Sequence, residues 1–250
     1  MPRKPKPVNT DTAPDTAPVA PNDFEGFSPA AFQFLKDLAT HQDRDWFTAN
    51  KHVYEAQVLE PMTRLVIGLG DALRTRSVPL HGNAKNAIFR IYRDVRFSND
   101  KSPYKTHIGA ALTRDGQKMS PGVVYVHVEP AGCFAACGFY QPEPRMLAEI
   151  RSVIASHGDD LLKRLATVEA AGYTLASDPA ALKRLPRGFE DVSDPRLQDL
   201  LRRKSMVYTL PLSQAALKKP GVVTAIADFA SATRPLLQFG WDAIDSRSAV

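Results

Sequence analysis

The chain has 250 residues, of which 44% are hydrophobic and 24% are charged, the composition of an ordinary globular protein with a sizeable core. No apolar run approaches the ~20 residues of a membrane span, and no apolar segment follows the basic residues of the N-terminus, so we expect a cytoplasmic protein without a membrane partner. The formal net charge of +5 suits an acidic small ligand and falls short of a dedicated DNA-binding surface.

The first segment of the chain, residues 1–23, is rich in Pro, Ala and Thr and contains the repeat DTAPDTAP. Such a segment cannot bury a core, so we expect it to be a disordered tail. No linker interrupts the rest, and we expect one α+β domain over residues 24–245.

Helical spacing dominates the start of this domain. Ser28 and Pro29 are typical of an N-cap and a first helical turn. A second helical stretch begins at Asp43, and a long helix is predicted over residues 52–76. Pro61 falls inside this helix and should kink or split it.

The periodicity changes at Ile88. Four segments of alternating apolar residues follow, at 88–98, 106–113, 123–129 and 133–140, and their short connections predict an antiparallel meander. Helical spacing returns over 143–171, with a break near His157. A short helix over 195–203, a further strand over 205–212 and a last helix over 220–237 complete the chain.

The predicted fold class is therefore α+β, with an antiparallel β-meander of at least four strands flanked by N-terminal and C-terminal helices. The two cysteines, Cys133 and Cys137, fall on one predicted strand, too far apart for a disulfide without a turn between them. Their spacing is not that of a zinc pair either, so we expect both to be small core residues.

The segment from Lys85 to His107 carries six cationic side chains against two aspartates, a net +4 of the whole chain's +5. A localised positive field on a pleated surface suits an anionic ligand. The apolar residues of the predicted strands alternate with polar ones and so occupy one face of the predicted sheet. The opposite face collects the polar set, namely Arg90, Tyr92, Asp94, Arg96, His107, Tyr125 and His127. A solvent-exposed sheet face with cross-strand pairs would carry the same pattern.

Arg93 is the exception, because it falls among the apolar residues. A guanidinium in that position needs a partner such as Asp94, Asp100 or a ligand, unless a bulge rotates it out.

We interpret the basic segment as an anion-binding face. The ligand-binding candidates are Arg90, Tyr92, Arg93, Arg96, Asp100, Lys101, Lys105, Tyr125 and His127. The catalytic candidates are His107 for proton transfer, with Tyr92 or Tyr104 beside it, and Asp94 to orient an arginine.

His107 and His127 could meet across neighbouring strands as an acid/base pair or two metal ligands. The six histidines nevertheless show no metal-ligand spacing, and the common nucleotide, hydrolase and metalloprotease motifs are absent from the sequence. We therefore expect no bound metal and no cofactor.

The same segment carries a resemblance to a known family. Residues 89–107 read FRIYRDVRFSNDKSPYKTH, which is similar to the signature of the DUF2461 family, proteins of unknown function. Further motifs resemble those of the family at 44–55 (RDWFTANKHVYE), 125–144 (YVHVEPAGCFAACGFYQPEP) and 185–205 (LPRGFEDVSDPRLQDLLRRKS). The resemblance covers roughly residues 25–240. It implies an α+β domain and brings no established activity.

The residues fit three interpretations of function. The first is a binder of an anionic small molecule such as a nucleotide or another phosphate- or carboxylate-bearing metabolite, with or without catalysis. The second is a nucleic-acid-binding module in which Tyr92, Tyr104 and Tyr125 stack on bases. The third is a structural or partner-binding protein in which arginines and aspartates form an internal ion-pair lattice.

Overall fold

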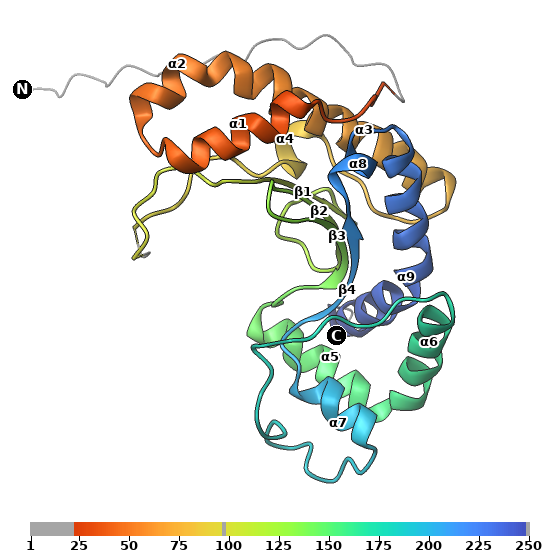
Figure 1. The fold of residues 1–250 in the computed structure, drawn as a ribbon. Helices are drawn as coiled ribbons and strands as arrows, with labels where there is room; N and C mark the ends of the chain where they lie inside the picture. Colours follow the sequence, from red (N-terminus) through yellow and green to blue (C-terminus); the bar gives the residue numbers. More distant parts are fainter. Residues whose placement is uncertain (1–22, 97–98, 249–250) are drawn as a thin grey trace, which may run out of the picture.

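A computed structural model gives the structure of residues 23–96 and 99–248. The predicted disordered tail, residues 1–23, lies outside this part of the chain except for Asp23. Four antiparallel strands form one sheet in the order β1 (Ile108–Thr113), β2 (Val123–Val128), β3 (Cys133–Phe139) and β4 (Met206–Leu212). Helices flank the sheet (Figure 1), so the predicted α+β class with an antiparallel sheet is confirmed.

The N-terminal helices begin where their capping residues predict. At the start of α1 (Pro29–Thr40), the Ser28 hydroxyl accepts a hydrogen bond of 3.3 Å from the Ala31 N–H. Three elements then follow without a gap: α2 (Arg44–Tyr54), the π-helical turn η1 (Glu55–Leu59) and α3 (Glu60–Thr75). The turn ends two residues before Pro61, whose ring would clash with the helical carbonyl four residues earlier. The predicted interruption is therefore a π-helical turn in one continuous helical segment.

The sheet is a three-strand meander with one strand added later in the chain. Ile108 stands opposite Val128, Val126 opposite Ala135, and Cys137 opposite Tyr208. The helices α5 (Pro144–Ser156), α6 (Gly158–Ala170) and α7 (Pro195–Arg202) separate β3 from β4. The break near His157 and the strand over 205–212 are thus confirmed. The last helix, α9 (Gly221–Ser248), runs further than predicted, and α4 (Ala84–Ala87) and α8 (Gln214–Leu217) are two short helices that the sequence did not indicate.

The predicted strand over 88–98 is wrong for the part that the structure describes, residues 88–96. It makes only isolated bridges, from Ile88 to Ala110 of β1 and from Tyr92 to Tyr104. The alternation itself is real, because Ile91 is buried while Arg90 and Tyr92 on either side are exposed. Alternation records which side of a segment is buried. The backbone of this segment bonds to β1 up to Phe89 and to residues 103–105 from Ile91 on, so it forms no continuous ladder.

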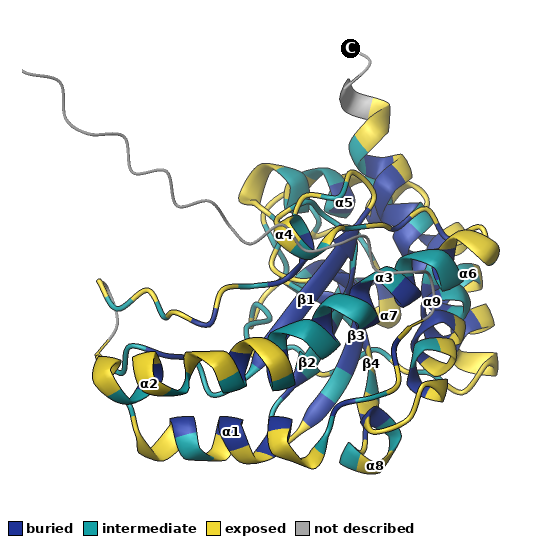
Figure 2. Cartoon of the chain, turned by 90° about the horizontal axis from the view of Figure 1, so that it is seen from above, coloured by how far each residue is buried: buried dark blue, intermediate teal, exposed yellow. Residues whose placement is uncertain are grey.

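The core lies between the sheet and two helices. Figure 1 shows α3 and α9 on one side of the sheet, and Figure 2 shows buried residues concentrated on the strands and on the sides of these helices that face them. On this side Val124, Val126 and Val128 are buried, and both cysteines are buried and free of disulfides, as predicted. Among the helices of residues 23–96 and 99–248, none has the length and apolar character to cross a membrane.

Candidate functional site

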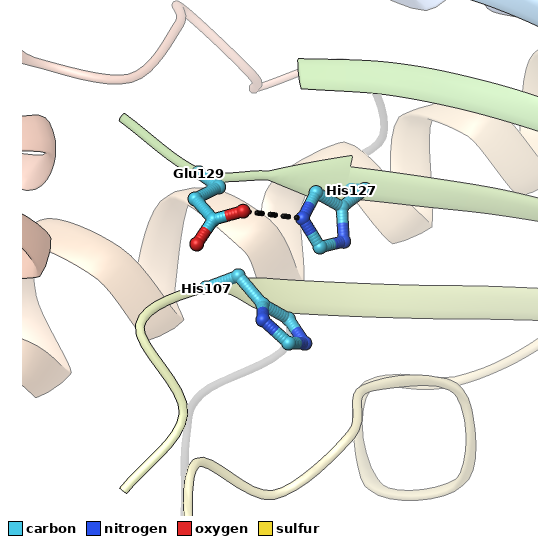
Figure 3. Close-up of side chains that lie close together, drawn as sticks. All are labelled: His107, His127 and Glu129. Atoms are coloured by element: carbon cyan, nitrogen blue, oxygen red, sulfur yellow. Dashed lines mark hydrogen bonds and ion pairs between the residues drawn. The ribbon is translucent and has the colours of Figure 1, made fainter. Parts of the chain in front are cut away.

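The sheet face opposite α3 and α9, which we call the outer face, brings together His107, His127 and Glu129 (Figure 3). His127 belongs to β2, His107 precedes β1 and Glu129 follows β2. Because Ile108 stands opposite Val128, the next residues outward, His107 and Glu129, project from the same end of the strand pair. The period of two along β2 places His127 and Glu129 on one face.

Hydrogen bonds connect this cluster to two hydroxyl groups. The Tyr125 Oη lies 3.0 Å from Nδ1 of His127, and Nε2 of His127 lies 3.3 Å from Oε2 of Glu129. The Thr106 hydroxyl donates a hydrogen bond of 2.8 Å to the other carboxylate oxygen, Oε1. Both ring nitrogens of His127 and both oxygens of Glu129 are therefore oriented by named partners.

Aromatic packing fixes the rings of the cluster. The His107 and His127 ring centroids are 4.4 Å apart, and Phe134 of β3 stacks on His127 at 4.8 Å with an angle of 17°. The Tyr125 ring lies across Gly109 of β1, where any Cβ atom would collide with the Tyr125 hydroxyl. A glycine at this position is therefore what lets the phenol reach His127.

Burial and neighbouring charges set the protonation of the cluster. Burial, followed by the proximity of His127, lowers the pKa of His107 to about 4. Burial, followed by the Glu129 charge, raises the pKa of Tyr125 to about 12. Burial acts against ionisation of Glu129, but hydrogen bonds from Thr106 and His127 outweigh it and leave the pKa of Glu129 below its ordinary value. At neutral pH His107 is uncharged, Tyr125 is protonated and Glu129 is ionised.

A group of cations adjoins the cluster around Phe89. The Lys105 and Lys118 Nζ atoms lie 5.7 and 5.8 Å from the centroid of the Phe89 ring, which packs edge-on against Tyr125 at 6.0 Å. Burial, then the charges of Arg90 and Lys118, lower the pKa of Lys105. Within the described ranges, no carboxylate forms an ion pair with Arg90, Lys105 or Lys118. We call these three residues the cation group.

Other predicted site residues are engaged elsewhere. Arg93 forms an ion pair with Asp100, one of the partners that its sequence position suggested. Asp94 accepts two hydrogen bonds from the Arg96 guanidinium, at 3.0 and 2.7 Å, and a third from the Arg96 backbone N–H at 3.2 Å; these bonds lower the pKa of Asp94 to about 2. These two pairs are exposed and lie in the loop that leaves the sheet.

The tyrosines and the lysine of the same loop also lie apart from the histidines. Tyr104 is only 3% exposed and stacks on Phe47 of α2 at 4.3 Å, and Tyr92 packs against both rings. Burial raises the pKa of Tyr104. The Lys101 ammonium donates to the Val95 carbonyl at 3.0 Å. The structure thus unites His107, Tyr125 and His127, with Lys105 and the ion-paired Arg93 close enough for their charges to lower the pKa of His107 further. Arg90 acts on Lys105, and Tyr92, Tyr104 and Lys101 are not brought to the histidines.

Sequence reasoning did not select Glu129, Thr106, Phe89, Lys118 or Phe134 as site residues. For Glu129 a signal existed, because it stands two residues after His127 and so shares its face. Lys118 gave no such signal, since it lies in the connection between β1 and β2 and reaches Phe89 through the fold.

Two hollows in the described surface lie away from the outer face. One, of about 500 Å³, is formed by the end of α3 and the loop after it, from Gly70 to His81. The other, of about 360 Å³, lies at the start of α5 and includes Lys204 and Arg151. Neither contains a predicted site residue, and the candidate site lies instead on the half-buried outer face of the sheet.

The fold and this site define an α+β protein whose antiparallel sheet carries histidines, a glutamate and unpaired cations on its outer face. The family model described as "Conserved hypothetical protein (DUF2461)" matches residues 30–239, most of the chain. The chain therefore belongs to the DUF2461 family. No curated protein and no solved structure matches it.

Proposed function

We propose that the protein binds a small anionic molecule, carrying a phosphate or a carboxylate, on the outer face beside Tyr125. The observation that carries this proposal is the cation group: Lys105 and Lys118 lie over Phe89, the charge of Arg90 acts on Lys105, and none of the three forms an ion pair with a carboxylate among the described residues. Like charges held together repel one another, and an anion between them relieves that repulsion.

The contrast with the neighbouring arginines supports this choice of residues. Arg93 is already paired with Asp100, and Arg96 with Asp94. The cation group has its charge available for a ligand, while the paired arginines contribute mainly to the local field. Arginine and lysine side chains of this kind make charge-assisted hydrogen bonds to phosphate and carboxylate oxygens.

A thermal-shift screen with inorganic phosphate, nucleotides and dicarboxylates tests the proposal. A ligand at about 100 times its dissociation constant adds roughly 2.7 kcal/mol to the free energy of unfolding. Arg90→Ala should weaken binding roughly 10–100-fold, the range of a lost charged hydrogen bond. The matched control is Arg187→Ala, because Arg187 is also exposed and has no ion pair in the described part of the chain. Equal stabilisation of both variants by every anion would overturn the proposal.

A structural role for the loop arginines is the second candidate, and the Arg93–Asp100 and Arg96–Asp94 pairs favour it. On this alternative, removing Arg93 lowers stability and changes no ligand affinity. The nucleic-acid interpretation is distinguished by salt: contacts with many phosphates give an affinity that falls steeply with salt concentration, whereas one small anion gives a shallow dependence.

A further inference from the structure

We infer that His107, His127 and Glu129 form a binding site for a divalent transition-metal ion on the outer face. This inference goes beyond anion binding and does not depend on it. It also departs from the expectation of no metal drawn from histidine spacing, because the third ligand, Glu129, emerges only from the strand pairing.

The donor atoms have separations close to those of a coordination shell. One ligand atom from each of the three residues lies within 4.8 Å of the others. Nε2 of His127 and Oε2 of Glu129 are 3.3 Å apart. Two donors bound about 2.1 Å from one metal stand roughly 3.0–3.4 Å apart at octahedral or tetrahedral angles. The His127–Glu129 pair already has this separation, and His107, with a donor atom within 4.8 Å of the other two, is the third ligand.

The hydrogen-bond partners of His127 and Glu129 are of the kind that commonly orient metal ligands. A metal-bound histidine usually makes a hydrogen bond through its other nitrogen, and a bound carboxylate through its other oxygen. Here the Tyr125 Oη lies at Nδ1 of His127, and the Thr106 hydroxyl occupies Oε1 of Glu129. The two donor atoms left over, Nε2 and Oε2, are the two that face each other across 3.3 Å. This division of roles gives both side chains a second partner that stays in place when a metal enters.

The site is also held on rigid structure. β2 lies between β1 and β3, so both of its edges are paired, and Phe134 of β3 stacks on the His127 ring. The His127 side chain is 12% exposed and that of Glu129 is 30% exposed. His127 is thus fixed by a central strand and by packing, and His107 and Glu129 directly adjoin paired strands, so the ligands need little reordering on binding, which favours affinity.

The donor set selects the class of metal. Two imidazole nitrogens and one carboxylate suit Zn²⁺, Fe²⁺, Co²⁺ or Mn²⁺, whereas Mg²⁺ and Ca²⁺ prefer oxygen donors. Three protein ligands leave at least one coordination position for water or another molecule from the outer face. The ion gains one negative charge from Glu129, so the centre remains positive.

A cobalt titration of the untagged, chelator-stripped protein tests the site. We expect one Co²⁺ per chain, seen as visible ligand-field absorption, displaced by Zn²⁺ and unaffected by excess Mg²⁺. Glu129→Gln, which keeps the side-chain shape, and His107→Ala should each weaken Co²⁺ binding roughly 100-fold or more. Tyr125→Phe, which removes only the outer hydrogen bond, should weaken it about 10-fold. His52→Ala is the matched control, because His52 is exposed on α2, outside the cluster, and this variant should bind as the wild type does.

Circular dichroism of each variant shows whether weaker Co²⁺ binding comes from loss of a metal ligand or from loss of folding. If His107→Ala does not fold, the Glu129→Gln variant alone tests the site. Co²⁺ binding that is as tight in folded Glu129→Gln as in the wild type would overturn the inference, as would folded wild-type protein that takes up neither Co²⁺ nor Zn²⁺. Arg90→Ala keeps the two proposals apart: it should lose anion binding and retain the metal.

Discussion

Replacing Gly109 by alanine tests whether the Tyr125 phenol lies across β1 and so reaches His127. A Cβ atom at Gly109 would overlap the Tyr125 hydroxyl and stand 2.9 Å from two carbons of its ring. Gly109 has no left-handed backbone conformation, so the substitution introduces steric overlap without backbone strain. The ring has little room to move, because it packs against Phe89 and bonds His127.

The expected loss of stability follows from three contributions. Forcing extra volume into a packed site costs about 1–3 kcal/mol, and losing the Tyr125–His127 hydrogen bond costs about 0.5–1.5 kcal/mol. Alanine in a strand is favoured over glycine by about 0.5–1 kcal/mol. The net destabilisation should be about 0.5–4 kcal/mol, which for a chain of this size lowers the melting temperature by about 2–4 °C per kcal/mol.

Urea unfolding followed by tryptophan fluorescence measures this difference. Gly132→Ala is the control, because a Cβ atom there meets nothing within 4 Å and the glycine is not left-handed; it should be neutral or stabilising by up to about 1 kcal/mol. In a Tyr125→Ala background the cost of Gly109→Ala should disappear. The same cost in both backgrounds would refute the placement of the phenol.

Three further predictions concern parts of the fold away from the site. Burial raises the pKa of Asp178, but backbone N–H donors, including those of Lys204 and Ser205 at 2.6 and 2.9 Å, outweigh it and lower the pKa overall. Asp178→Asn should therefore cost about 1–3 kcal/mol at pH 7, and urea unfolding at several pH values should show this gap closing as pH falls below about 4. Burial raises the pKa of Cys137 to about 12, so this thiol should react with a disulfide reagent only after unfolding; rapid labelling of Cys137 in the native protein would contradict its placement. The hydroxyl of Tyr208 is buried without a hydrogen-bond partner in the described structure, so Tyr208→Phe should raise the free energy of unfolding by about 1 kcal/mol; a loss of that size in thermal melts would show that the hydroxyl has a partner.

The parts of the fold that depend on local chemistry or on one buried face could be predicted from the sequence. Ser28 caps α1 through a bond to a residue three positions away, which needs no tertiary information. Val124, Val126 and Val128 alternate with Tyr125 and His127 because only one side of β2 faces α3 and α9. Burial of one face leaves a period of two in the sequence, so the buried side of β2 can be predicted from the sequence alone.

The structure of residues 88–96 could not be predicted from the sequence, because alternation does not identify the hydrogen-bonding partner. Ile88 bridges to β1, but Tyr92 bridges to Tyr104, so the chain folds back on itself before a ladder forms. The same turn pairs Arg93 with Asp100. In the site, the contact of His107 with His127 followed from strand adjacency, whereas the approach of Lys118 to Phe89 depends on how the β1–β2 connection folds back.

The cation group and the proposed metal site lie close together, so that although either can be occupied alone, their charges couple the two affinities. Phe89 contacts Tyr125, and Tyr125 bonds His127, so the two sites are linked by packed side chains. A divalent ion at Glu129 adds positive charge beside Arg90, Lys105 and Lys118, which opposes metal binding unless an anion is present. An anion held by the cation group removes that opposition and can fill the open coordination position. Inorganic phosphate should therefore tighten Zn²⁺ binding, and Zn²⁺ should tighten phosphate binding by the same factor, typically about 5–150-fold. Calorimetric titration of each in the presence of the other measures both factors, and a Zn²⁺ affinity unchanged by saturating phosphate would show that the two sites act separately.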